Sequence, residues 1–167
     1  MNRTRIYLLG FMGCGKTTTG KVLARKLGWE FADLDDEIQK GEGLSVAEIF
    51  RSSGESGFRN LENKYLNLLS VPTHRVVALG GGTFVNEENR NLTRATGFTV
   101  WLKVPFDKVV QRVRIDGTRP LFTAREQAEA LYDAREALYC HAGIHISTDD
   151  KSPEALADEI IEAIKTA

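Results

Sequence analysis

The sequence has few of the features that mark membrane, secreted and metal-binding proteins. Its 167 residues include only two cysteines and three histidines, and no run approaches the roughly 20 apolar residues of a membrane-spanning helix. The first five residues lead directly into an apolar stretch, so we expect no signal peptide. The histidines have no metal-ligand spacing with one another or with the cysteines, so we interpret them as structural or surface residues. We expect a cytoplasmic protein with no membrane partner.

An excess of charge of one sign is also absent. Twenty-two lysines and arginines face 23 aspartates and glutamates, which gives a formal net charge of −1 and no general attraction to nucleic acid. Hydrophobic residues make up 42% of the chain, enough for one core, and no repeat or linker divides it. We therefore expect a single domain over residues 1–167, and a monomer, since nothing indicates a dedicated interface.

Residues 10–17 read Gly-Phe-Met-Gly-Cys-Gly-Lys-Thr, a complete phosphate-binding loop. Gly10, Gly13 and Gly15 permit positive φ angles, so that successive backbone N–H groups converge on phosphate oxygens. Lys16 supplies a charge for the β- and γ-phosphates, and the Thr17 hydroxyl is placed to bind Mg²⁺. An apolar strand precedes the loop and a helix follows it, whose positive N-terminal end favours the same anion.

The loop predicts an ATP site whose first contacts come from consecutive residues: Gly13, Cys14, Gly15, Lys16, Thr17 and Thr18. Cys14 and Cys140 are interpreted as reduced thiols, because a disulfide in the loop would distort nucleotide binding. We favour Cys14 as a small residue at a variable loop position. The alternative is a reactive thiol whose pKa is lowered at a helix N-terminus.

Strand-like and helix-like stretches alternate along the chain. Strands are expected at residues 6–9, 30–34, 75–79, 98–102 and 145–147, and helices at 17–27, 46–53, 58–69, 86–94, 106–114, 125–141 and 153–165. Near-continuous apolar runs, as at residues 76–79, indicate strands buried on both faces of a parallel sheet. The order predicts a three-layer α/β/α fold of the P-loop NTPase type with a five-stranded parallel sheet. Ligands in such folds bind at the carboxyl ends of the strands.

Two stretches fit this regular pattern poorly. Residues 40–58 are rich in glycine and serine in their second half, and residues 116–123 hold a glycine and a proline between charged groups. Each is a candidate mobile flap over a site, and an ordinary surface connection is the alternative. We place a mobile lid at about residues 112–125.

Carboxylates follow the second expected strand. Asp33 and Asp35 would point the same way if the strand continued that far. One could help to hold Mg²⁺, and the other could accept a proton from an attacking hydroxyl. We assign Asp36 as the N-cap of a helix that starts near Glu37.

Three glycines and several arginines complete the candidate site. Gly80, Gly81 and Gly82 directly follow a buried strand, where they would let the backbone approach a ligand closely. Arginine guanidinium groups suit carboxylate or phosphate, and an arginine delivered by a flap can stabilise a transferring phosphoryl group. The arginines selected are Arg59, Arg112, Arg119 and Arg135.

In this order the motifs resemble those of the shikimate kinase family, a nucleoside-monophosphate-kinase-like branch of the P-loop fold. The resemblance spans essentially all 167 residues. It is carried by the loop at residues 10–17, Asp33-Leu34-Asp35, Gly57-Phe58-Arg59 with Glu62, Leu79-Gly80-Gly81-Gly82, Arg119-Pro120-Leu121, and Arg135 before Leu138-Tyr139.

The resemblance implies ATP-dependent phosphorylation of the 3-hydroxyl of shikimate, which yields shikimate 3-phosphate on the route to chorismate and the aromatic amino acids. By this match Asp35 binds the shikimate hydroxyls and activates the nucleophile, while Arg59 and Arg135 bind the carboxylate. The three glycines line the acceptor pocket, and Glu62 orients an arginine. The main acceptor-binding region is placed at about residues 33–62.

The same match places Asp33 in the Mg²⁺ shell and makes Arg119 the lid arginine that reaches the phosphates. Lys16, Asp35 and Arg119 are then the catalytic residues. Arg112 would lie against adenine, and Pro153 marks an adenine loop that matches only loosely. The chain also departs from the family near Tyr139, where the family often has a proline and a glutamate and this chain has Ala137, Cys140 and His141.

Other functions predict different sequence features, which can be compared with this chain. Gluconate kinase shares the loop and the general size, and its acceptor is also a hydroxylated carboxylate, so arginines and an aspartate alone do not separate the two. The set of Asp33-Leu34-Asp35, Arg59 and the three glycines favours shikimate. A GTPase needs an Asn-Lys-x-Asp element, but the only Asn-Lys pair, Asn63-Lys64, is followed by Tyr65-Leu66. An inactive ATP-binding module would be expected to lose Lys16, Asp35 or Arg119, and all three are present.

Overall fold

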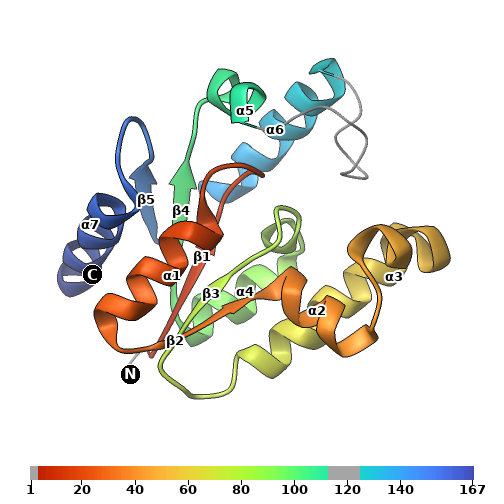
Figure 1. The fold of residues 1–167 in the computed structure, drawn as a ribbon, viewed down its shortest axis with the longest axis horizontal. Helices are drawn as coiled ribbons and strands as arrows, with labels where there is room; N and C mark the ends of the chain where they lie inside the picture. Colours follow the sequence, from red (N-terminus) through yellow and green to blue (C-terminus); the bar gives the residue numbers. More distant parts are fainter. Residues whose placement is uncertain (1–3, 113–124) are drawn as a thin grey trace.

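The computed structural model describes residues 4–112 and 125–167. Five parallel strands form one sheet in the order β2-β3-β1-β4-β5 (Figure 1). The strands are β1 (Arg5–Leu9), β2 (Glu30–Asp33), β3 (Arg75–Ala78), β4 (Phe98–Lys103) and β5 (Ile144–Ser147). The predicted five-stranded parallel sheet is confirmed, and each expected strand is present within a residue at either end.

Helices cover both faces of the sheet. They are α1 (Lys16–Leu27), α2 (Leu34–Glu42), α3 (Val46–Leu69), α4 (Glu87–Thr96), α5 (Phe106–Arg112), α6 (Arg125–Tyr139) and α7 (Pro153–Thr166), with a short 3-10 helix η1 (Thr83–Val85). In Figure 1, α1 and α7 pack together on the near face, whereas α4 lies behind the sheet against β4. The predicted three-layer α/β/α fold is confirmed. No helix in the described ranges has the length and apolar character needed to cross a membrane.

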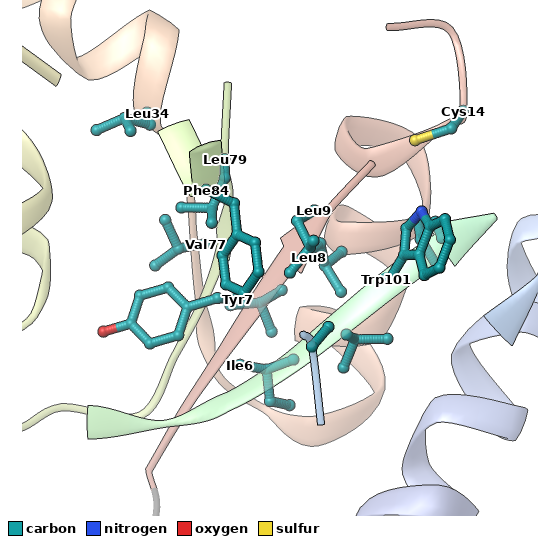
Figure 2. Close-up of a cluster of buried hydrophobic side chains, with 14 of the residues drawn as sticks. Ile6, Tyr7, Leu8, Leu9, Cys14, Leu34, Val77, Leu79, Phe84 and Trp101 are labelled. Carbon is teal, nitrogen blue, oxygen red and sulfur yellow. The ribbon is translucent and has the colours of Figure 1, made fainter. Parts of the chain in front are cut away.

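The central strand β1 anchors the core. All five of its residues are buried, with β3 on one side and β4 on the other. Figure 2 shows Tyr7, Leu8 and Leu9 among the side chains of Val77, Phe84 and Trp101. The Tyr7 hydroxyl contacts the Ser70 and Thr96 hydroxyls at 3.0 and 2.8 Å. Burial of each large apolar side chain contributes about 1.5–3 kcal/mol, so the end of β1, where the glycine loop begins, is firmly held.

Local sequence signals stand at the ends of several helices. Gly28 stops α1 in the left-handed conformation at φ 67°. Ser152 caps α7, and Pro153 occupies its first turn. Ser45 and Glu48 form a reciprocal capping box at the start of α3.

The expected flap at residues 40–58 is instead mostly helical. The end of α2 and the first half of α3 occupy it, and α3 continues past the predicted break to Leu69. Only Gly54, at φ 69° and ψ −175°, departs from helical geometry and bends the element. The serines and glycines lower helix propensity, but Ile49 and Phe58 are buried on either side of the bend, and such tertiary packing outweighs propensity.

The predicted cap of α2 is also wrong. Asp33, not Asp36, is the N-cap, and its side chain accepts a hydrogen bond from the Asp35 backbone N–H at 3.1 Å. Strand β2 ends at Asp33, whose extended backbone leaves its carboxylate free to turn towards the next amides. Asp35 therefore lies in the first turn of α2, and the expectation that both side chains alternate along one strand fails.

Candidate active site

The phosphate-binding loop connects β1 to α1 and is built on three left-handed glycines. Gly10, Gly13 and Gly15 have φ angles of 146°, 76° and 91°, as the sequence predicts. A Cβ on Gly10 would lie 2.7 Å from the Leu102 carbonyl oxygen, closer than real contacts allow. This loop conformation therefore requires glycine both for its backbone angles and for its space.

Lys16 folds back over the loop that precedes it. Its Nζ donates to the carbonyl oxygens of Gly10 and Phe11 at 2.8 and 3.2 Å and lies 3.7 Å from the Cys14 sulfur. The Cys14 thiol is buried, as its inward position in Figure 2 illustrates. The ammonium is thus held by the dipoles of two loop carbonyls, and the Phe11 carbonyl also accepts a hydrogen bond from the Cys14 N–H at 3.2 Å.

A cavity of about 280 Å³, the loop cavity, opens over this loop. Its lining includes Gly13, Gly15, Lys16, Thr17, Thr18, Asp33, Asp35, Gly80 and Gly81. The Thr17 hydroxyl donates to Asp33 Oδ2 at 2.7 Å. A hydroxyl and a carboxylate side by side are the hard oxygen ligands that Mg²⁺ prefers, so this pair fits the predicted ion.

A second cavity of about 350 Å³, the arginine cavity, adjoins the first. Its polar lining is Asp35, Gln39, Arg59, Glu62, Arg135 and the three glycines Gly80, Gly81 and Gly82; its apolar lining is Met12, Val46, Ala47, Phe50 and Phe58. Met12, Asp35, Gly80 and Gly81 line both cavities. Asp35 therefore stands at the junction, where a group bound in one cavity meets a group bound in the other.

The glycine turn, Gly80, Gly81 and Gly82, follows β3 and makes room for side chains. A Cβ on Gly80 would lie 2.9 Å from an oxygen of Asp35 and of Glu62. One on Gly81 would lie 2.9 Å from Arg135 Nη1, and one on Gly82 would lie 2.5 Å from both terminal nitrogens of Arg59. The turn therefore requires glycine because the functional side chains pack directly against its backbone. The sequence pattern alone did not supply this reason.

Arg59 is held by acidic partners. Its Nη1 donates to Glu62 Oε2 at 2.5 Å and its Nη2 to Glu55 at 3.3 Å. Glu62 is only 1% exposed, and its other oxygen accepts from the Thr83 hydroxyl at 2.6 Å. Burial alone would lower the pKa of Arg59, but the charge and hydrogen bond of Glu62 raise that pKa above its ordinary value. This arrangement agrees with the predicted orienting role of Glu62.

Arg135 lies in a different environment. It is 6% exposed, and it forms no ion pair with any residue in the described ranges, whereas Arg59 forms two. Its guanidinium carbon lies 5.5 Å from the centre of the Phe11 ring, and Tyr139 beside it donates its hydroxyl to the Gly81 carbonyl. Burial lowers the pKa of Arg135, and the charge of Arg59 lowers it further, although a guanidinium stays protonated at neutral pH. A buried cation in this state favours an anionic ligand.

The structure gathers most, but not all, of the predicted site residues. Pro153 begins α7 and does not line either cavity. Arg119 lies outside the described residues, as does the side chain of Arg112. Sequence reasoning missed Phe11, Thr83 and the apolar wall of Met12, Val46, Ala47 and Phe50, because these side chains carry no signal that separates them from ordinary core residues.

Comparisons with known proteins agree with this geometry. The family model described as shikimate kinase matches residues 12–165. The shikimate kinase of Persephonella marina is 42% identical over 161 residues, which cover 96% of this chain and 98% of that protein. The structure is similar to that of the Acinetobacter baumannii shikimate kinase in complex with shikimate, with a TM-score of 0.93, 36% identity, and coverage of 99% and 94%. The Aquifex aeolicus shikimate kinase structure gives a TM-score of 0.88 at 38% identity, with 96% of each chain covered. The chain therefore belongs to the shikimate kinase family and is an enzyme of the shikimate pathway.

Proposed function

We propose that this enzyme transfers the γ-phosphoryl group of ATP to the 3-hydroxyl of shikimate, with ATP in the loop cavity and shikimate in the arginine cavity. The observation that carries the proposal is the buried charge of Arg135, in a cavity that shares Asp35 with the phosphate-binding loop. A hydroxylated carboxylate can bind Arg135 through its carboxylate and Asp35 through its hydroxyls. Inorganic phosphate or a nucleobase does not offer both kinds of group.

The acceptor would be oriented by its two ends. Its carboxylate binds Arg135 and Arg59, whose planar guanidinium groups suit paired hydrogen bonds to two oxygens. Its hydroxyls face Asp35, and its ring packs against the apolar wall that includes Phe50 and Phe58. The acceptor hydroxyl then points past Asp35 into the loop cavity, towards the γ-phosphate.

Asp35 would orient the attacking hydroxyl and accept its hydrogen bond. General-base groups of this kind contribute about 10²- to 10⁴-fold to rates. Because phosphoryl transfer has a loose transition state, the position of the hydroxyl matters more than its full deprotonation.

The phosphates would replace the internal contacts of Lys16. Its ammonium lies on the carbonyls of Gly10 and Phe11, and it would exchange these contacts for the β- and γ-phosphates. Thr17 and Asp33 would hold the Mg²⁺ that accompanies ATP, and that ion supplies charge stabilisation to the phosphoryl oxygens when bound.

Several assignments remain predictions alongside this mechanism. Arg119 would reach the phosphates from a lid at about residues 112–125, Arg112 and Pro153 would lie near adenine, and Cys14 would contact ATP as part of the loop. The single-domain organisation over residues 1–167, a monomeric state and a cytoplasmic location stay predictions as well.

The test is release of ADP from Mg²⁺·ATP with shikimate or with gluconate, combined with mass detection of the product. We expect shikimate to gain one phosphoryl group and gluconate to gain none, and a phosphorus–proton correlation spectrum should place the group on the 3-oxygen. Turnover with gluconate alone, or phosphorylation at another hydroxyl, would overturn the acceptor assignment.

A further inference from the structure

Phe11 connects the phosphate-binding loop to the arginine cavity. It lies inside the loop, and its carbonyl oxygen accepts a hydrogen bond from Lys16 at 3.2 Å. Its ring is 2% exposed and lies 5.3 Å from the Tyr132 ring in an edge-to-face contact. The Arg135 guanidinium carbon lies 5.5 Å from the centre of the same ring. One loop residue thus touches the phosphate-binding lysine through its backbone and Arg135 through its side chain.

The two arginines of the cavity are held by different kinds of partner. Glu62 and Glu55 pair with Arg59 and neutralise much of its charge. The Phe11 ring attracts Arg135 through its negative face but carries no net charge, and unlike a carboxylate it forms no paired hydrogen bonds with the guanidinium. An aromatic face therefore offsets part of the burial cost of a guanidinium without forming the paired hydrogen bonds by which a carboxylate would occupy it.

We propose that Phe11 is a positioning residue for Arg135, whose ring face holds the guanidinium in place to bind the acceptor carboxylate. This inference rests on the proposed function, because it takes shikimate as the acceptor. It predicts that weakening the ring face raises the KM for shikimate. The KM for ATP and kcat should stay within about twofold, because the Phe11 backbone, Lys16 and Asp35 are unchanged.

The experiment uses the full chain with fluorinated phenylalanine at position 11. Mono-, di- and trifluorinated rings keep nearly the same shape while their faces become progressively less negative. We expect the KM for shikimate to rise stepwise, to about fivefold or more with the trifluorinated ring, as a partly desolvated cation–π contact implies. Phe11→Leu, which removes the ring face altogether, should exceed the whole series.

Phe31 provides a matched control. Lys21 lies over its ring, with Nζ 5.9 Å from the centre, and neither residue lines the arginine cavity. The same fluorinated residues at position 31 should leave the KM for shikimate unchanged.

The outcomes separate this inference from the function beneath it. A stepwise rise in the KM for shikimate at position 11 alone supports it. A flat series overturns it, as does a parallel rise in the KM for ATP, which would indicate general damage to the loop. Absence of shikimate turnover in the unmodified enzyme would instead defeat the proposed function.

Discussion

The loop cavity and the arginine cavity adjoin each other but are built in opposite ways. The loop cavity is formed largely by consecutive residues, and the positive φ angles of Gly13 and Gly15 set the course of its backbone. The arginine cavity collects side chains from α2, α3 and α6 around the glycine turn, and these segments are far apart in the sequence. The loop cavity thus depends mainly on the backbone conformation of one loop. The arginine cavity depends on side chains that the fold brings together.

This difference assigns a separate kinetic consequence to each cavity. Changes in the loop cavity should affect nucleotide binding and kcat, whereas changes in the arginine cavity should affect the KM for shikimate. Asp35 lines both cavities and should affect turnover without weakening nucleotide binding. The predictions below test this division, beginning with the largest effect.

Lys16→Met should give the largest loss. It removes the charge aimed at the phosphoryl group, and loss of one such preorganised donor costs about 10²- to 10³-fold in kcat. Steady-state ADP release with saturating shikimate measures the effect. Near wild-type kcat would mean that the phosphates do not bind on this loop.

Asp35→Asn should lower kcat by about 10²-fold, at the low end of general-base effects, because the amide keeps part of the orienting hydrogen bond. Nucleotide affinity, measured by fluorescence titration with an ATP analogue, should stay within about twofold. If nucleotide affinity falls together with kcat, Asp35 belongs to the metal site instead.

Arg59→Ala should raise the KM for shikimate, with a loss of about 2–4 kcal/mol in binding free energy. Part of this loss arises because the change leaves the buried Glu62 carboxylate facing the acceptor. Adding Glu62→Gln to Arg59→Ala should therefore restore some of the affinity. The same Glu62→Gln change should not rescue Arg135→Ala, since Arg135 makes no ion pair with Glu62.

A purely additive result in the double-mutant cycle of Arg59 and Glu62 would contradict this account of the pair.

Gly82→Ala should have the smallest effect, a rise of a few fold in the KM for shikimate. The added Cβ would meet the terminal nitrogens of Arg59 at 2.5 Å, but these lie at the end of a flexible side chain that can shift. Gly28→Ala offers a control outside the site, since nothing lies within 4 Å of a Cβ there; it should lower stability through its φ of 67° and leave the KM unchanged. Equal KM values for Gly82→Ala and wild type would mean that Arg59 is not held against the turn.

The same contrast explains how much of the molecule the sequence could predict. The loop and the parallel sheet follow from local patterns, because the residues that make each of their elements are neighbours in the chain. Asp35, Arg59 and Arg135 could be selected as residues, but their meeting point depends on the packing of three helices. The roles of Phe11 and Met12 could not be predicted, because the sequence does not distinguish an apolar residue of the core from one that lines a binding cavity.

The errors have a similar origin. Asp36 was chosen as the cap of α2 because the sequence does not show that β2 ends at Asp33, which can then cap the helix itself. Residues 40–58 looked like a flap because their glycine and serine content lowers helix propensity. The contacts that stabilise this helix, such as the ring contact of Phe50 with Phe58 at 4.8 Å, form only after folding.

The most direct test of the account is a comparison of kcat/KM for shikimate and for its carboxamide, in wild type and in Arg135→Ala. The wild-type enzyme should prefer the carboxylate by about 100-fold, because the uncharged amide leaves the buried guanidinium without an anion. In Arg135→Ala that preference should fall at least about tenfold. An equal preference in both enzymes would show that the acceptor carboxylate does not bind Arg135, and would contradict the central claim.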